Sequence, residues 1–168
     1  MQLNTAFISE LEFEANSTRK MLSRVPFDNT DWQPHDKSTT IKNLALHVSR
    51  VSEWIPLIVN HDDVDLTTSP FPPYPEIHSA EELTQYFDNN IAHAKKALES
   101  MTNEDIMKPF IMRRGDFIIF TLPKAAALRN MAFNHAIHHR GQLSVYLRLL
   151  DIPVPGMYGP SADEKRPA

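Results

Sequence analysis

Residues 128–150 of the chain read LRNMAFNHAIHHRGQLSVYLRLL, and this stretch decides the fold that we expect. At about 100° per residue, its apolar side chains recur along one stripe of a helix. The stripe consists of Leu128, Met131, Ala132, Leu143, Tyr146, Leu149 and Leu150. His135 and His139 fall near its centre, whereas His138 falls toward its flank. The pattern therefore directs two imidazoles, one turn apart, at the core.

Two earlier stretches show the same helical period. The first runs from about Asn4 to Leu22, and Pro26 stops it. The second runs over about 41–58, and Pro56 should kink it or mark its weakening end. Its first turn can be capped by a hydroxyl that accepts a bond from a free backbone N–H, and the candidates are Ser38, Thr39 and Thr40.

The second half of the chain adds two helices and a hairpin. A helix is expected over 79–98, because Ser79 and Glu82 have the spacing of a capping box. Two β-rich runs around a Gly–Asp turn predict a hairpin over 110–120. The helix that contains the quoted stretch should run over about 123–150.

The remaining segments are expected to be irregular. Residues 61–78 are polar and then proline-rich, which predicts a semi-rigid connector, and the tail 151–168 holds four prolines. No internal repeat or domain boundary is visible. The sequence therefore predicts a single domain over residues 1–168, with an all-α fold: an antiparallel four-helix bundle with a short β-hairpin insertion.

Composition excludes several classes of function. The chain has 168 residues, 42% of them hydrophobic, and a net charge of −4, which makes it a poor candidate for binding nucleic acid. It has no cysteine, which removes disulfides, iron–sulfur clusters, thiolate zinc sites and a cysteine nucleophile. No segment is apolar enough to span a membrane and no signal peptide is visible. We therefore expect a cytoplasmic protein without nucleic-acid or membrane partners.

A third inward histidine comes from the second predicted helix. His47 shares a face with Val51, Trp54 and Ile58. Three imidazoles from two helices form a set that zinc or a similar divalent ion accepts, with one position left open. The alternative is that these are hydrogen-bonded core histidines. Burying three such rings without partners would cost several kcal/mol, at about 1–3 kcal/mol each, and this favours a metal.

The segment Asn134-His135-Ala136-Ile137-His138-His139-Arg140-Gly141-Gln142-Leu143 resembles the DinB-like, or YfiT-like, family of metal-binding four-helix bundles. The family pattern is a histidine, three residues, a second histidine and then Arg-Gly-Gln. The Trp32-x-Pro34-His35 loop with the His47 helix resembles a second landmark of the family. The ending at 158–163 is also similar, so the resemblance covers nearly the whole chain.

The resemblance implies a metal triad of His47, His135 and His139, with zinc or nickel as the ion. Relatives are often homodimers, which implies a homodimer here. The superfamily includes enzymes that transfer a low-molecular-weight thiol to an electrophile. A thiol on the metal would lose its proton and become the nucleophile.

Three functions stay open at this point. The first is a metal-dependent thiol S-transferase acting on a small molecule. The second is a metal-dependent hydrolase with the same ligands and water as the nucleophile. The third is a stress protein without catalysis that binds a metal or a small molecule.

Three residues are candidates for binding substrate: Trp54, Gln142 and Tyr158. Each also has an ordinary structural explanation. Trp54 fits the core, Gln142 fits an outer partner for a ligand histidine, and Tyr158 fits packing of the tail.

Overall fold

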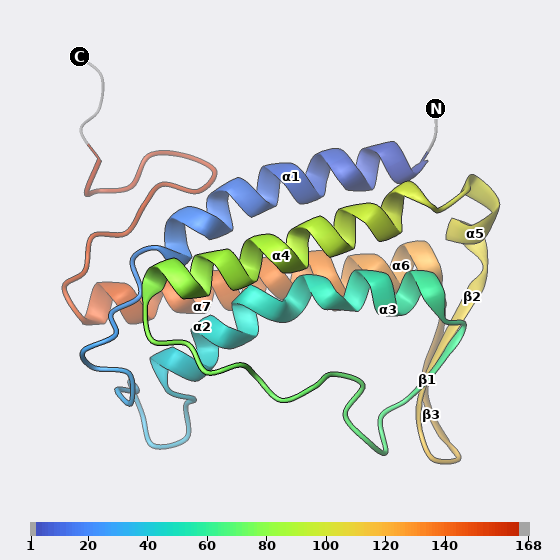
Figure 1. Cartoon of the computed structure of the whole chain (residues 1–168), viewed down its shortest axis with the longest axis horizontal. Coiled ribbons are helices and arrows are strands. Elements are labelled where there is room, and N and C mark those ends of the chain that lie inside the picture. The colour runs from blue at the N-terminus through green and yellow to red at the C-terminus, as the bar shows by residue number, and fades with distance from the viewer. Residues whose placement is uncertain (1–2, 165–168) are drawn as a thin grey trace.

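The computed structural model describes residues 3–164. Long helical segments lie side by side, and a small sheet projects at one end (Figure 1). Helix α1 contacts α4 and α7, and α2 contacts the same two helices. The helical elements are α1 (Leu3–Leu22), α2 (Ile41–Arg50), η1 (Val51–Glu53), α3 (Trp54–Asn60), α4 (Ala80–Glu99), α5 (Asn103–Met107), α6 (Lys124–Leu128), η2 (Arg129–Asn134) and α7 (His135–Leu149).

The sheet is larger than the predicted hairpin. Strands β2 (Pro109–Arg114) and β3 (Phe117–Pro123) pair antiparallel, and Gly115 takes a positive φ of 58° in the turn. A third strand, β1 (Asp63–Asp65), pairs parallel to β2. The predicted helical fold with a hairpin is therefore confirmed in part: the protein is mostly helical and the hairpin is present, but a third strand makes the sheet three-stranded.

Strand β1 was missed because its own sequence carries no strand signal. It is three residues long and lies in the connector that was expected to be irregular. Arg113 on β2 fixes it from the side, with its Nε 2.8 Å from Asp63 Oδ1 and its Nη1 2.6 Å from Asp65 Oδ2. The strand forms through these cross-strand pairs and through burial of Val64, rather than through local propensity.

The predicted helix starts are confirmed at two caps. Of the three candidates before α2, Thr40 is the cap, and its Oγ1 accepts a bond from Asn43 N. Ser79 caps α4 by accepting from Glu82 N. Such bonds satisfy N–H groups that have no partner within the helix.

The second predicted helix is interrupted earlier than Pro56. Residues Val51–Glu53 form a 3-10 turn, and helix α3 then continues through Pro56 to Asn60. A proline ring clashes with the carbonyl four residues before it, which here belongs to Ser52. The interruption therefore lies one turn upstream of the proline that causes it.

The last predicted helix changes its winding part-way. Between α6 and α7, residues Arg129–Asn134 form a π-helical turn. A π turn is wider than an α turn and is often found at functional sites. It ends immediately before His135, so it sets the direction in which α7 presents its side chains.

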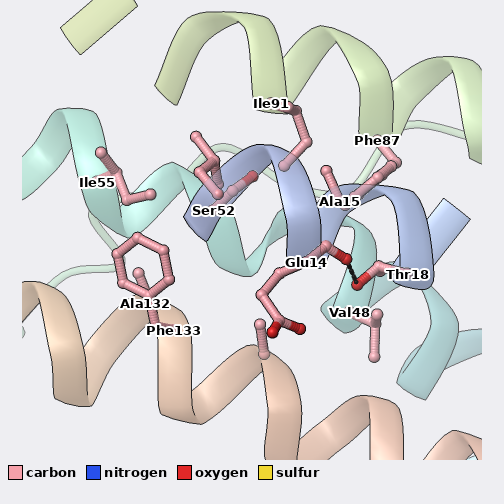
Figure 2. A pocket seen from close by; sticks show the side chains of 12 residues that line it. Glu14, Ala15, Thr18, Val48, Ser52, Ile55, Phe87, Ile91, Ala132 and Phe133 are labelled. Atoms are coloured by element: carbon pink, nitrogen blue, oxygen red, sulfur yellow. Dashed lines mark hydrogen bonds between the residues drawn. The ribbon is translucent and has the colours of Figure 1, made fainter. Parts of the chain in front are cut away.

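The core consists of two clusters of buried apolar side chains. One cluster lies toward the sheet and includes Ile58, Leu98 and Phe110; the other lies around Leu44 and Leu143. Between helices α1, α2, α4 and α7 a small, mostly apolar cavity remains, with a volume of about 30 Å³ (Figure 2). Within residues 3–164, no helix combines the length and apolar character that crossing a membrane requires.

Candidate metal site

The three predicted histidines lie together. His47 extends from α2, and His135 and His139 extend from successive turns of α7. One ring nitrogen of each lies within 4.8 Å of the others. The Nε2 atoms of His47 and His135 are 3.1 Å apart, and the His139 ring centroid lies 4.5 Å from that of His47. Residues 88 positions apart in the sequence thus form one group.

A separate polar group contacts the Nδ1 atom of each ring. His139 Nδ1 lies 2.7 Å from Gln142 Oε1, and His135 Nδ1 lies 3.2 Å from the carbonyl oxygen of Met131. His47 Nδ1 lies 3.4 Å from the Tyr74 hydroxyl. In the tautomer that donates from Nδ1, each ring presents the Nε2 lone pair to the group. Such outer partners are what orient histidine ligands in metal sites.

The electrostatic surroundings keep the imidazoles neutral. The pKa of His47 is lowered from 6.5 to about 4, chiefly by burial and in addition by charge repulsion from His139, His135 and Arg50. Burial is also the largest cause that lowers the pKa of His135 and His139. Neutral imidazole is the form that binds a metal.

The residues present fit a divalent ion. Tetrahedral zinc with Zn–N bonds of 2.0–2.1 Å requires its ligand nitrogens to be about 3.3 Å apart. The observed Nε2–Nε2 distance of 3.1 Å between His47 and His135 is close to this value. Without an ion, two nitrogen atoms at this distance can share only one proton. The three-histidine group could therefore bind a metal ion, with no further protein ligand in the group.

Two open pockets meet at His47. One is lined by His135, Arg50, Trp54 and Phe71, and the other by His139, Gln142 and Tyr74, together with Thr39, Asn43 and Leu44. No acidic side chain among residues 3–164 lines either pocket. Trp54 and Gln142, two of the predicted substrate contacts, thus lie on opposite sides of the histidine group.

The third predicted contact, Tyr158, lies elsewhere. It lines neither pocket, and its hydroxyl lies 2.7 Å from Arg140 Nη2 and 2.9 Å from Glu14 Oε2. Arg140 is buried and forms an ion pair with Glu14 at 2.7 Å. His138 is exposed, as its position on the flank of the predicted stripe suggested.

Sequence reasoning missed the contribution of the proline-rich connector. Phe71 and Tyr74 belong to this segment, and each lines one of the two pockets. The Trp54 and Phe71 rings pack edge to face at 4.9 Å. Two aromatic residues among four prolines indicated that the connector packs against another part of the fold. Nothing in the periodicity indicated which helix it would cover.

The fold has counterparts among known proteins. The family model described as "DinB family" matches residues 1–167. The chain belongs to the DinB family. The resemblance inferred from the His-x-x-x-His-Arg-Gly-Gln segment is confirmed.

Individual relatives agree with this membership. The DinB-family protein described here is 27% identical over 158 residues to the uncharacterized protein YrdA of Bacillus subtilis, covering 94% of this chain and 89% of YrdA. It is similar to the crystal structure of a DinB-like protein from Bacillus cereus, with a TM-score of 0.67, 26% identity, and coverage of 90% and 95% of the two chains.

A second solved structure shares the fold. It is the DinB-like protein YjoA of Bacillus subtilis, with a TM-score of 0.67, 18% identity, and coverage of 95% of this chain and 98% of YjoA. At this identity the likeness concerns the fold alone.

Proposed function

We propose that this DinB-family protein is a metal-dependent thiol S-transferase in which His47, His135 and His139 hold one zinc or nickel ion. The observation that carries the proposal is the convergence of three imidazoles from two helices where two open pockets meet. Three neutral ligands keep the full charge of the ion and leave a position open. The bound ion supplies Lewis acidity, which favours loss of the proton from a thiol in that position.

The protein's own residues orient and enclose the reactants. Gln142 and Met131 fix two imidazole rings through Nδ1. Because the chain has no cysteine, the thiol must be a second substrate. Transfer forms a bond between the thiol sulfur and a carbon of the electrophile, the bond from that carbon to the leaving group breaks, and the thiol proton passes to solvent. Trp54 and Phe71 offer an apolar wall for the electrophile.

The pocket lining favours a thiol over water as the nucleophile. Hydrolysis needs a general base or acid beside the water in most metal sites, usually a carboxylate or histidine. In the part of the chain that the structure describes, the lining residues of both pockets include no Asp or Glu. A thiol that has lost its proton needs no such base. The hydrolase alternative therefore has less support.

The proposal also covers the bundle architecture, the oligomeric state, the substrate and the location. Contacts of α1 with α4 and α7, and of α2 with the same helices, support an antiparallel four-helix bundle. A homodimer with a small-molecule thiol substrate, in the cytoplasm, completes the proposal.

The test begins with elemental analysis of untagged protein. We expect about one zinc or nickel ion per chain, retained in His138→Ala and lost in His139→Ala. His138→Ala is the matched control, because it removes an exposed imidazole next to His139 that is not a proposed ligand. Absence of metal from the wild type, even after zinc or nickel is added, would overturn the metal site.

Activity is then measured with an arylating probe. Chlorodinitrobenzene releases chloride as the sulfur–carbon bond forms, and a panel of low-molecular-weight thiols supplies the nucleophile. We expect a rate that requires both metal and thiol and that is lost in His139→Ala. If the protein binds metal but turns over no thiol or ester probe, it is a metal-binding protein without catalysis.

A further inference from the structure

Among residues 3–164, Arg50 is the one arginine that lines the histidine pockets. It ends α2, three residues after His47, and it lines the same pocket as Trp54, Phe71 and His135. At this spacing on a helix, the side chains of Arg50 and His47 lie on neighbouring parts of one face. The cation therefore stands beside the place where the metal-binding nitrogens converge.

The guanidinium of Arg50 is held in position by neutral groups. Its Cζ lies 3.5 Å from the centroid of the Tyr74 ring and 5.3 Å from that of Phe71. Its Nη1 donates to the carbonyl oxygen of Pro72 at 2.7 Å. Stacking on an aromatic face and one carbonyl bond fix the orientation of a guanidinium without neutralising its charge.

No carboxylate of the described chain pairs with Arg50. Arg19, Arg113, Arg129, Arg140 and Arg148 each pair with an Asp or Glu among residues 3–164. Glu53, three residues after Arg50, instead lies 3.1 Å from His93 Nδ1 on α4. The Arg50 pocket thus contains an oriented cation and two of the three neutral imidazoles, His47 and His135, and no acidic side chain among residues 3–164 lines it.

We propose that Arg50 binds a carboxylate of the small-molecule substrate. This rests on the proposed function, since the carboxylate would belong to a molecule whose thiol reaches the histidine group. A guanidinium matches a carboxylate through two parallel N–H···O bonds, which is more specific than a point charge. Trp54 and Phe71, the apolar wall proposed for the electrophile, line the same pocket as Arg50.

The first arm of the test changes the ligand and leaves the protein intact. Isothermal calorimetry on the zinc-loaded protein compares mercaptopropionate with mercaptopropionamide, which differ only in the charged group. We expect the carboxylate to bind about 10-fold to 100-fold more tightly, the range for hydrogen bonds to a charged group. Equal affinities would overturn the proposal.

The second arm changes the protein. Arg50→Met should lose the preference for the carboxylate while keeping its metal and its affinity for the amide. Arg24→Met is the matched control, because Arg24 is exposed, has no ion pair within residues 3–164 and lines neither pocket. Arg50→Lys should retain only part of the preference. A preference unchanged in Arg50→Met would mean that the metal binds the carboxylate, and would overturn the role of Arg50.

A third arm separates this inference from the proposed function. Phenylpropionate and phenylpropionamide carry no thiol, and they are compared on metal-free protein. A preference for the carboxylate that Arg50→Met abolishes supports the Arg50 site even where thiol transfer fails. Thiols that bind zinc-loaded protein regardless of charge would support the proposed function and overturn the carboxylate site.

Discussion

Two sides of helix α7 hold buried polar groups in opposite ways. Toward α1, the Arg140 guanidinium meets Glu14, Thr18 Oγ1 and the Tyr158 hydroxyl, so its charge and its donors are satisfied within the chain. Figure 2 shows the Glu14 carboxylate extending from α1 toward α7. Toward α2, His135 and His139 meet only another imidazole and neutral outer partners.

The difference separates a structural polar group from a functional one. A buried group whose partners are complete contributes to one packing arrangement and offers nothing to a ligand. The imidazole nitrogens of the histidine group face one another with too few protons to form all their hydrogen bonds. Their bonding is therefore complete only when a ligand binds. The four predictions below test this contrast, starting from the largest expected effect.

The largest effect is expected for His47→Ala on the histidine side. The substitution removes the proposed metal ligand on α2 and leaves the two on α7. Zinc affinity should fall by more than about 100-fold, the upper range for losing an outer partner. Competition with a chromogenic chelator measures it. His138→Ala should change affinity little, and an equal loss in both variants would remove the distinction between ligand and neighbour.

Arg140→Met tests the satisfied side. It leaves the Glu14 carboxylate, whose side chain is 13% exposed, without its cation. We expect a loss of about 3–5 kcal/mol in the free energy of unfolding, measured in urea on metal-free protein.

Arg148→Met is the matched control on the same helix. Its pair with Asp163 is exposed, with the Arg148 side chain at 49%, and should be worth about 0–1 kcal/mol. Similar losses in the two variants would contradict the view that the Arg140 pair is a core element.

Gln142→Ala tests the outer partner of a proposed ligand. It removes the acceptor that lies 2.7 Å from His139 Nδ1, and zinc affinity should fall about 10-fold to 100-fold. Asn43→Ala changes an amide that lines the same pocket but contacts no histidine nitrogen, and it should have no effect. Unchanged affinity in Gln142→Ala would leave the glutamine as a pocket wall only.

The last prediction concerns the pH dependence of the metal-free protein. Burial, with charge repulsion from His139, His135 and Arg50, holds the pKa of His47 at about 4, below its ordinary 6.5. Between these values the unfolded chain binds the proton and the folded chain does not, so stability falls as the pH falls from about 6.5 to about 4. Urea unfolding across this range measures the slope. His47→Phe should flatten it, and an unchanged slope would assign the effect to other groups.

Much of the helical part of the fold was predictable because its signals are local. Thr40 and Ser79 are caps whose side chains reach backbone N–H groups three residues on, and the sequence alone displays that spacing. The His135/His139 pair was likewise visible on one helix. His47 was predictable as an inward residue, but its 3.1 Å approach to His135 depends on how α2 packs on α7.

The features that were missed depend on tertiary contacts or on changes of winding. Leu149 was expected on the buried stripe but is 57% exposed, whereas Leu147 is fully buried. The π turn before α7 shifts the phase of every later residue, which a wheel of uniform 100° steps does not include. Strand β1 depends on Arg113, which lies 48 positions from Asp65.

The π turn also bears on how this chain tolerates insertions and deletions. An α-helix that gains one residue can accommodate it as a wider turn, so residues 129–134 have the form of such an insertion. Deleting one residue there would restore regular α winding and rotate everything after it by about 100° relative to α6. His135 and His139 would then leave the side that faces His47. The length of this six-residue segment is thus as strictly constrained as the identity of the histidines that follow it.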